Sequence, residues 1–115
     1  MRRLAVAIAA ATALAVPALA HHGWGSYDAA NPVTLKGPIR KMEFVNPHVH
    51  LDIESEGKTW ELTLAPPFRM NNRGAIETLL PVGRVVTAYG YKSKVRDGEM
   101  RAEWIEVEGK RYELR

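Results

Sequence analysis

Apolar and polar residues alternate along most of the chain that follows residue 32. A period of two is typical of β-strands, because successive side chains point to opposite sides of a strand. In the clearest case Val49, Leu51 and Ile53 alternate with histidine and acidic residues, so one side of this strand is expected to face a core. The strands predicted from such patterns cover residues 33–44, 48–54, 59–64, 84–93, 100–107 and 111–114.

The first predicted strand contains an irregularity. The apolar residues of 33–39 share one alternating face, but Met42 and Phe44 continue the set one residue late. A β-bulge near Arg40-Lys41, or a bend at Gly37-Pro38, would produce such a slip.

One segment, residues 68–80, has a helical pattern, and Gly74 is expected to divide it into two short turns. Three strands, a short helix and two or more further strands predict a mainly β protein. The predicted fold is a small OB-type β-barrel of five to six strands, with the short helix between strands 3 and 4. Another small barrel or a sandwich with a helical insertion is the alternative. The helical residues predicted to pack inward are Phe68, Ile76, Leu79 and Leu80.

The first twenty residues differ in composition from the rest. Two arginines precede the apolar run 4–16, and residues 18–20 supply the small side chains that signal peptidase requires. A transmembrane anchor would need about 20 apolar residues, and this run is shorter. We therefore predict cleavage between Ala20 and His21 and a location in the periplasm, or secretion. The predicted organisation is a signal peptide at 1–20, an N-terminal arm at 21–32 and a single OB-like barrel domain at 33–115.

The charge balance and the lack of cysteine limit the functions. The whole chain has 16 basic and 13 acidic residues, and loss of the signal peptide would leave 14 basic ones. A nucleic-acid-binding protein normally has a basic stripe and a larger excess of Lys and Arg, so no nucleic-acid partner is expected. Without Cys, zinc-finger, thiolate-copper and cysteine-nucleophile chemistry is excluded. Any metal must be held by His, carboxylate, Met or backbone groups.

All four histidines fall in two short clusters. His21 and His22 would open the mature chain, where the α-amine and the ring Nδ1 of His21 can close a six-membered chelate around one ion. The reference pKa of an α-amine is about 7.7–8.0, so a divalent ion can displace its proton near neutral pH. A site of nitrogen donors favours Cu(II) among the first-row divalent metals.

The second cluster is His48-Val49-His50. Residues i and i+2 of a strand lie on the same side, about 6.8 Å apart, so the two imidazoles can converge on one ion, and Asp52 extends the row. In an OB-type barrel the outer face of strands 2 and 3 is the usual ligand surface. The alternative interpretation is that both histidines simply occupy the solvent-facing side of the strand.

Several short motifs occur together along the mature chain: His21-His22, Tyr27-Asp28, Thr34-Leu35-Lys36-Gly37, Asn46-Pro47-His48, Arg73-Gly74 and Leu80-Pro81-Val82-Gly83. With them the chain resembles a family of small exported bacterial proteins of unknown function. The resemblance covers nearly all of the mature chain. It implies an OB-type barrel in the periplasm and no established activity. The positions that it marks are His21, His22, Asp28, Asn46 and His48.

Together these features predict a periplasmic, non-catalytic metal-binding protein with copper as the preferred metal. Signature motifs of hydrolases, metalloproteases and nucleotide-binding enzymes are absent from the sequence, so no enzyme activity is expected. Trp24 and Tyr27 are expected to pin the arm onto the barrel. The alternative is a metal-free OB module for an envelope partner or small ligand, and neither version is an integral membrane protein. The predicted metal ligands are His21, His22 and His48, with His50 or Asp28 assisting.

Overall fold

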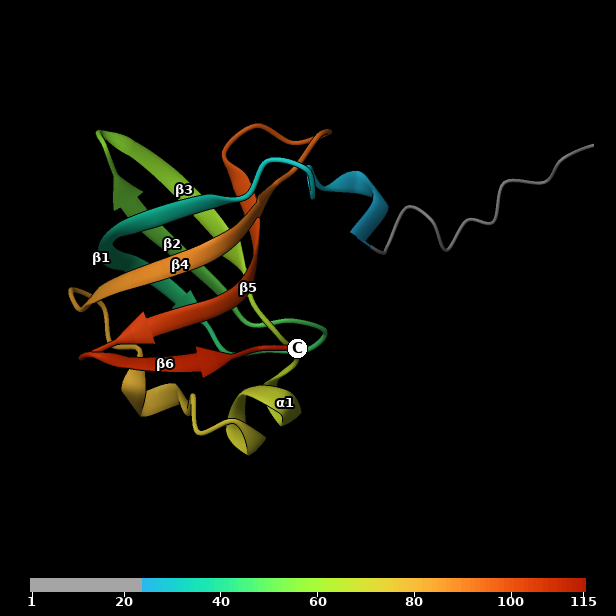
Figure 1. Cartoon of the computed structure of the whole chain (residues 1–115). Helices are drawn as coiled ribbons and strands as arrows, with labels where there is room; N and C mark the ends of the chain where they lie inside the picture. The colour runs from blue at the N-terminus through green and yellow to red at the C-terminus, as the bar shows by residue number, and fades with distance from the viewer. Residues whose placement is uncertain (1–23) are drawn as a thin grey trace, which may run out of the picture.

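The computed structural model describes residues 24–115, and the predicted signal peptide, His21 and His22 lie outside the described residues. One sheet of six strands carries most of the described chain, with two short helical segments between its third and fourth strands (Figure 1). In chain order the elements are η2 (Trp24–Ser26), β1 (Val33–Glu43), β2 (His50–Ser55), β3 (Lys58–Thr63), α1 (Pro67–Asn72), η3 (Glu77–Leu79), β4 (Val85–Lys92), β5 (Glu99–Val107) and β6 (Lys110–Glu113).

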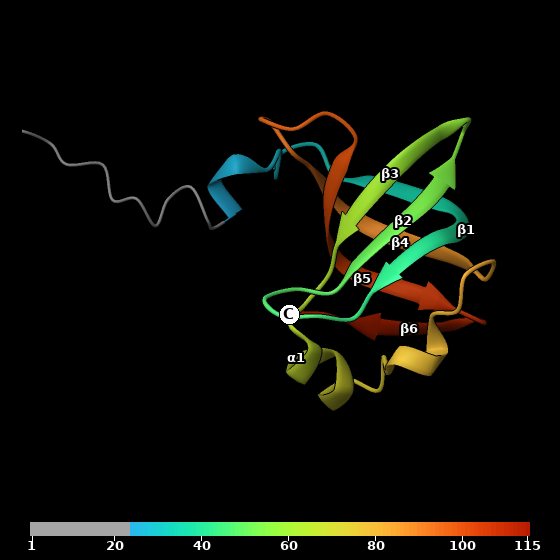
Figure 2. The ribbon, with the colours of Figure 1, turned by 180° about the vertical axis from the view of Figure 1, so that it is seen from behind.

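The sheet closes on itself to form a barrel. Its strands follow the order β3-β2-β1-β4-β5-β6, and β3 also pairs with β5 in parallel, with Glu61 opposite Glu99. Figure 2 shows β1, β2 and β3 side by side on one wall of this barrel. Five closed strands, an additional β6 beside β5 and helical turns between β3 and β4 form a small OB-type barrel, as the sequence predicts.

β1 bends where it passes from one neighbouring strand to the other. Its first half pairs with β4 and its second half with β2, and the register with β2 shifts between Ile39 and Lys41. This shift confirms the predicted bulge. Just before it, a Cβ atom on Gly37 would lie 1.7 Å from the main-chain oxygen of Glu54 in β2. The missing side chain at residue 37 therefore allows the two backbones to approach each other.

The apolar residue just before β2 and the alternating apolar residues within β2 fill the inside of the barrel. Val49, Leu51 and Ile53 are fully buried, and they belong to one continuous hydrophobic core. The intervening residues His50 and Asp52 remain partly exposed on the outer surface. The period of two in this strand therefore places His50, Asp52 and Glu54 on one outer row, where they can meet a ligand.

The segment between β3 and β4 differs in detail from its prediction. Gly74 follows the six-residue α1 with a φ of +83°, which confirms the predicted division at this residue. The sequence predicts that Phe68 and Ile76 pack inward, and this is wrong, because they are 76% and 47% exposed. Met70 and Ala75 are buried in their place. A helix of less than two turns buries only a narrow stripe, and here Met70 occupies it.

The last residues of this segment pack as the sequence predicts. Leu80 is fully buried and Leu79 packs against the core, as predicted. None of the helices in residues 24–115 is both long enough and apolar enough to cross a membrane.

Candidate functional site

The N-terminal arm is attached to the barrel at the end of β4. Tyr27 forms an isolated antiparallel bridge with Ser93, and its hydroxyl donates a hydrogen bond to the carboxylate of Glu99. The main-chain N–H of Asp28 donates to the carbonyl of Lys92 at 2.9 Å. Main-chain and side-chain contacts therefore both hold the arm in place, and Tyr27 is one of its two predicted anchors.

Glu99 is a buried carboxylate, 6% exposed, where β3 and β5 pair. It accepts hydrogen bonds from the hydroxyls of Tyr27 and Thr63, the latter at 3.3 Å, and forms an ion pair with Arg96 at 3.2 Å. Burial, together with the hydrogen bond to Glu99, raises the pKa of Tyr27 to about 12. Thr63 is buried as well, because β5 covers this end of β3.

Trp24 is the second anchor of the arm, and it lies against two guanidinium groups. The Cζ atoms of Arg101 and Arg115 lie 4.2 and 4.0 Å from the centre of its ring, well inside the range of a cation–π contact. Tyr91 of β4 meets the same ring edge-on, with the ring centres 5.6 Å apart. The arm is therefore fixed on the barrel three residues after His21.

His48 lies just ahead of β2, which begins at His50 and not at His48 as the sequence predicts. Its side chain is half-buried. Burial lowers the pKa of His48 below its ordinary value, and the nearby Arg101, His50 and Arg69 lower it further. The imidazole is therefore neutral at pH 7, which is the state that binds metal ions. Arg101, which touches the arm, is thus also a neighbour of His48.

The lowered pKa of His48 predicts how stability depends on pH. The unfolded chain takes up a proton on His48 near the ordinary pKa of 6.5, whereas the folded protein does so only at lower pH. Between these values the unfolded state binds more protons, so the free energy of unfolding is expected to fall as the pH drops below 6.5. Urea titrations at several pH values, with a chelator present, measure this fall. The fall in the free energy of unfolding should be smaller in His48→Asn than in the unmodified protein. An equal fall in the two proteins would mean that other groups cause it.

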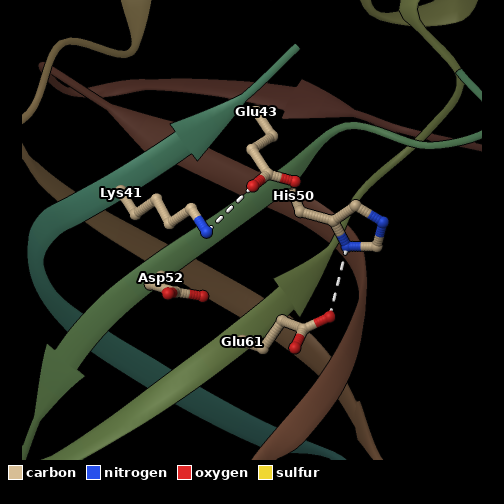
Figure 3. Close-up of a pocket in the computed structure, with 5 residues that line it drawn as sticks. All are labelled: Lys41, Glu43, His50, Asp52 and Glu61. Carbon is tan, nitrogen blue, oxygen red and sulfur yellow. Dashed lines mark ion pairs between the residues drawn. The ribbon is translucent and has the colours of Figure 1, made fainter. Parts of the chain in front are cut away.

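His50 lines a cavity of about 220 Å³ on the outer face of β1, β2 and β3, together with Lys41, Glu43, Asp52 and Glu61 (Figure 3). Its Nδ1 lies 3.5 Å from a carboxylate oxygen of Glu61. This nitrogen is buried and has no aligned hydrogen-bond partner among the described residues. The other ring nitrogen points away from Glu61. Metal-binding histidines commonly have this orientation, with a carboxylate at one ring nitrogen and the ion at the other.

Charges of both signs surround this cavity. The Nζ of Lys41 lies 2.9 Å from a carboxylate oxygen of Glu43, and a guanidinium nitrogen of Arg96 lies 3.1 Å from Glu61. Asp52 is directly opposite both Lys41 and Glu61 on the neighbouring strands. Because like charges in opposed positions repel, the two basic groups compensate for the Asp52–Glu61 pair.

The predicted ligands do not make a complete metal site within residues 24–115. The carboxylate of Asp28 accepts hydrogen bonds from the Asn31 amide at 3.2 and 3.3 Å. Over these residues no group of three or more His, Cys, Asp or Glu side chains could hold a metal ion. Asp28, His48 and His50 are therefore not sufficient by themselves, and the other predicted donors, His21 and His22, lie outside the described residues.

Two features of this region have no local signal in the sequence. Glu99 directly follows a turn glycine, as a solvated acid would, and its partner Tyr27 is 72 positions away. Arg101 and Arg115 likewise meet Trp24 only because the barrel closes. A polar position within the strand pattern, such as Arg101 in 100–107, indicates an outward-facing side chain but not its partner.

The sequence profile of a family of unknown function, DUF6152, matches residues 9–103. The chain belongs to this family. The match confirms the resemblance to a family of unknown function, and it supports no activity by itself. No curated protein matches this DUF6152 protein.

Solved structures of a much larger protein, TiaS, contain a similar barrel. A complex of TiaS with a tRNA and ATP is 17% identical with a TM-score of 0.53, over 70% of the DUF6152 chain and 18% of the TiaS chain. A ZRD-deleted mutant of TiaS in complex with agmatine is 18% identical with a TM-score of 0.56, over 76% and 27% of the two chains. The DUF6152 chain thus spans a small part of either protein, and at these identities the likeness concerns the fold alone.

Proposed function

We propose that this DUF6152 protein is a non-catalytic copper-binding protein of the periplasm, with His21 at its amino terminus after cleavage of the signal peptide. The observation that carries the proposal is that Arg101 contacts Trp24 and also lies opposite Thr63, which is itself opposite His50, so the arm and the histidines of residues 48–50 share this neighbour. The arm is therefore anchored, three residues after His21, close to a neutral imidazole. The bound ion would be stored, delivered or sensed rather than used in turnover.

The length of the arm permits a shared site. An extended chain advances about 3.3–3.6 Å per residue, so the three steps from Trp24 tether His21 within about 11 Å of it. In this proposal the α-amine and ring of His21 share one site with His48 within that span. His22 offers a further imidazole from the same arm, and Asp28 offers an oxygen donor.

The donor set of this site consists mainly of nitrogen. His48 and His50 supply two imidazoles, and Glu61 stands at the Nδ1 side of the His50 ring, where it supports binding through Nε2. The charges of Arg101 and Arg69 oppose any bound dication. An ion that binds nitrogen strongly is needed to overcome this repulsion, and Cu(II) is the strongest binder among the first-row divalent metals.

A Cu(II) titration followed by electron paramagnetic resonance tests the proposal. The protein should be matured by export, so that His21 is its first residue. We expect one-to-one, submicromolar binding with nitrogen hyperfine structure, and a loss of affinity of at least about tenfold in His48→Asn, since even outer partners of metal ligands are worth that much. Asp52→Asn is the matched control, because it alters a side chain of the same outer row that is not a proposed ligand. Equal affinities in both variants would contradict the assignment of His48.

The cavity beside His50 favours a second candidate function, a metal-free module that binds an envelope partner or a small ligand. Its lining carries both charge signs, and it lies on the face that OB-type barrels commonly use for ligands. In that case Glu61→Gln would weaken partner binding, whereas the residues before Trp24 could be altered without effect. The dependence on a free His21 therefore separates the two functions.

A further inference from the structure

The surface around Trp24 concentrates positive charge. The Cζ atoms of Arg101 and Arg115 both lie close to the ring, at 4.2 and 4.0 Å from its centre, so the two guanidinium groups are no more than about 8 Å apart. Like charges at this separation repel each other. The aromatic face offsets part of that repulsion, but it supplies no anion.

Arg101 has no carboxylate partner within residues 24–115. Burial lowers the pKa of Arg101, which reflects the cost of holding its charge away from water. The buried acid Glu99 acts in the opposite direction and raises the pKa of Arg101, but its carboxylate is already engaged by Tyr27, Thr63 and Arg96. A half-buried guanidinium without an anion is unusual, because such groups are normally paired.

A third arginine joins these two from helix α1. A guanidinium nitrogen of Arg69 donates to the carbonyl of Leu114 at 3.4 Å, which brings its charge beside Arg115. The positive charges of Arg115 and Arg69 both lower the pKa of Arg101. Among the described acids, Glu103 forms an ion pair with Arg115 at 3.7 Å, and it also accepts the hydroxyl hydrogen bond of Tyr91. Positive charge therefore exceeds negative charge here.

We propose that Arg101, Arg115 and Arg69 form a binding site for a phosphate group beside Trp24. A guanidinium that stacks on an aromatic ring keeps its in-plane N–H donors available, and their fork matches two oxygens of a phosphate. Trp24 holds two such forks close together, and the helix supplies the third charge. The ligand is free phosphate or a phosphate monoester at the surface of a lipid bilayer.

This site does not depend on the proposed copper function. Its residues all belong to the described part of the chain, and none of them is a proposed metal ligand. Phosphate binding is therefore measured in metal-free protein with a chelator present. Loss of the proposed metal ligands would therefore leave the phosphate site intact.

Calorimetric titration of the full mature chain with inorganic phosphate at low ionic strength and pH 7 tests the site. We expect saturable binding, weakened at least about tenfold in Arg101→Met, which keeps an apolar stem on Trp24 but removes the charge. Arg111→Met is the matched control. The Cζ atom of Arg111 also lies close to a tryptophan ring, 4.1 Å from the centre of Trp104, but Arg111 is paired with Glu113 at 2.9 Å. Absence of saturable binding, or equal losses in the two variants, would overturn the proposal.

Two further measurements complete the test. One uses a second variant in case the first does not fold, and the other identifies where the bound phosphate comes from. Arg115→Met removes the exposed member of the pair and should also weaken phosphate binding, so the test does not depend on Arg101→Met being folded. Sedimentation with phosphatidylcholine vesicles that contain phosphatidic acid then identifies the source. Vesicle binding that Arg101→Met abolishes assigns a lipid phosphate, and phosphate binding without vesicle binding assigns a soluble one. Vesicle binding that all variants retain, without phosphate binding, contradicts the site.

Discussion

Replacement of Gly37 by alanine is expected to lower the free energy of unfolding by about 3 kcal/mol or more, the upper end of the usual cost of overpacking. The new Cβ would lie 1.7 Å from the main-chain oxygen of Glu54. Because both partners belong to the backbone, no change of rotamer relieves the clash, and β1 and β2 must separate. Proteins of this kind are stable by about 5–15 kcal/mol, so the loss is a large share of the total. The midpoint of urea unfolding measures it.

Gly109→Ala is the matched control for this prediction. Gly109 has a φ of +78°, and a Cβ atom there would meet nothing within 4 Å. Its replacement should cost only about 1–2 kcal/mol, the usual penalty of the left-handed backbone conformation. Equal urea midpoints for the two variants would mean that the approach of Glu54 does not restrict residue 37.

Four residues added before His21 are expected to abolish submicromolar Cu(II) binding, whereas a single added residue would make His22 the third residue and create a new Cu(II) chelate with the amine and backbone amides. The extension turns the α-amine into an amide, whose proton is held far more tightly, and so opens the six-membered chelate. His48 and His50 would remain, but two imidazoles near Arg101 and Arg69 should retain a dication only weakly. Competition with a chelator of known affinity measures the difference between the exported and the extended protein.

Proteolytic removal of the added residues provides the control for the extension. It restores His21 as the first residue without any change in the barrel, so the affinity should return. Equal affinity of the extended and the trimmed protein would contradict a role of the α-amine. The metal-free candidate function, with its cavity beside His50, would then be preferred.

The strands of this barrel could be predicted because each has one face inside it. Burial then repeats every second residue, so Val49, Leu51 and Ile53 indicate their own strand, and a slip of the pattern indicates the bulge in β1. The helical segment has too few turns for such a pattern. Whether Phe68 or Met70 enters the core depends on where α1 meets the barrel, and that is a matter of tertiary packing.

Only the part of the candidate site that lies on β2 could be predicted from the sequence. The alternation in β2 correctly places His50 and Asp52 on the outer surface. The cation–π contacts of Trp24 and the contact between Tyr27 and Glu99 join opposite ends of the chain. No periodicity encodes such pairs, because their partners meet only after the sheet has closed.

The parallel pairing of β3 with β5 also orders the events of folding. Contacts between distant parts of a chain form late and slow the overall rate, and until β5 is present the free edge of β3 can pair with another molecule. Glu99 lies where β3 and β5 pair, and it accepts hydrogen bonds from Thr63 of β3 and from Tyr27 of the arm. Closure of the barrel and docking of the arm therefore depend on the same carboxylate. A chain synthesised from its N-terminus can acquire an ordered arm only when the barrel itself is complete.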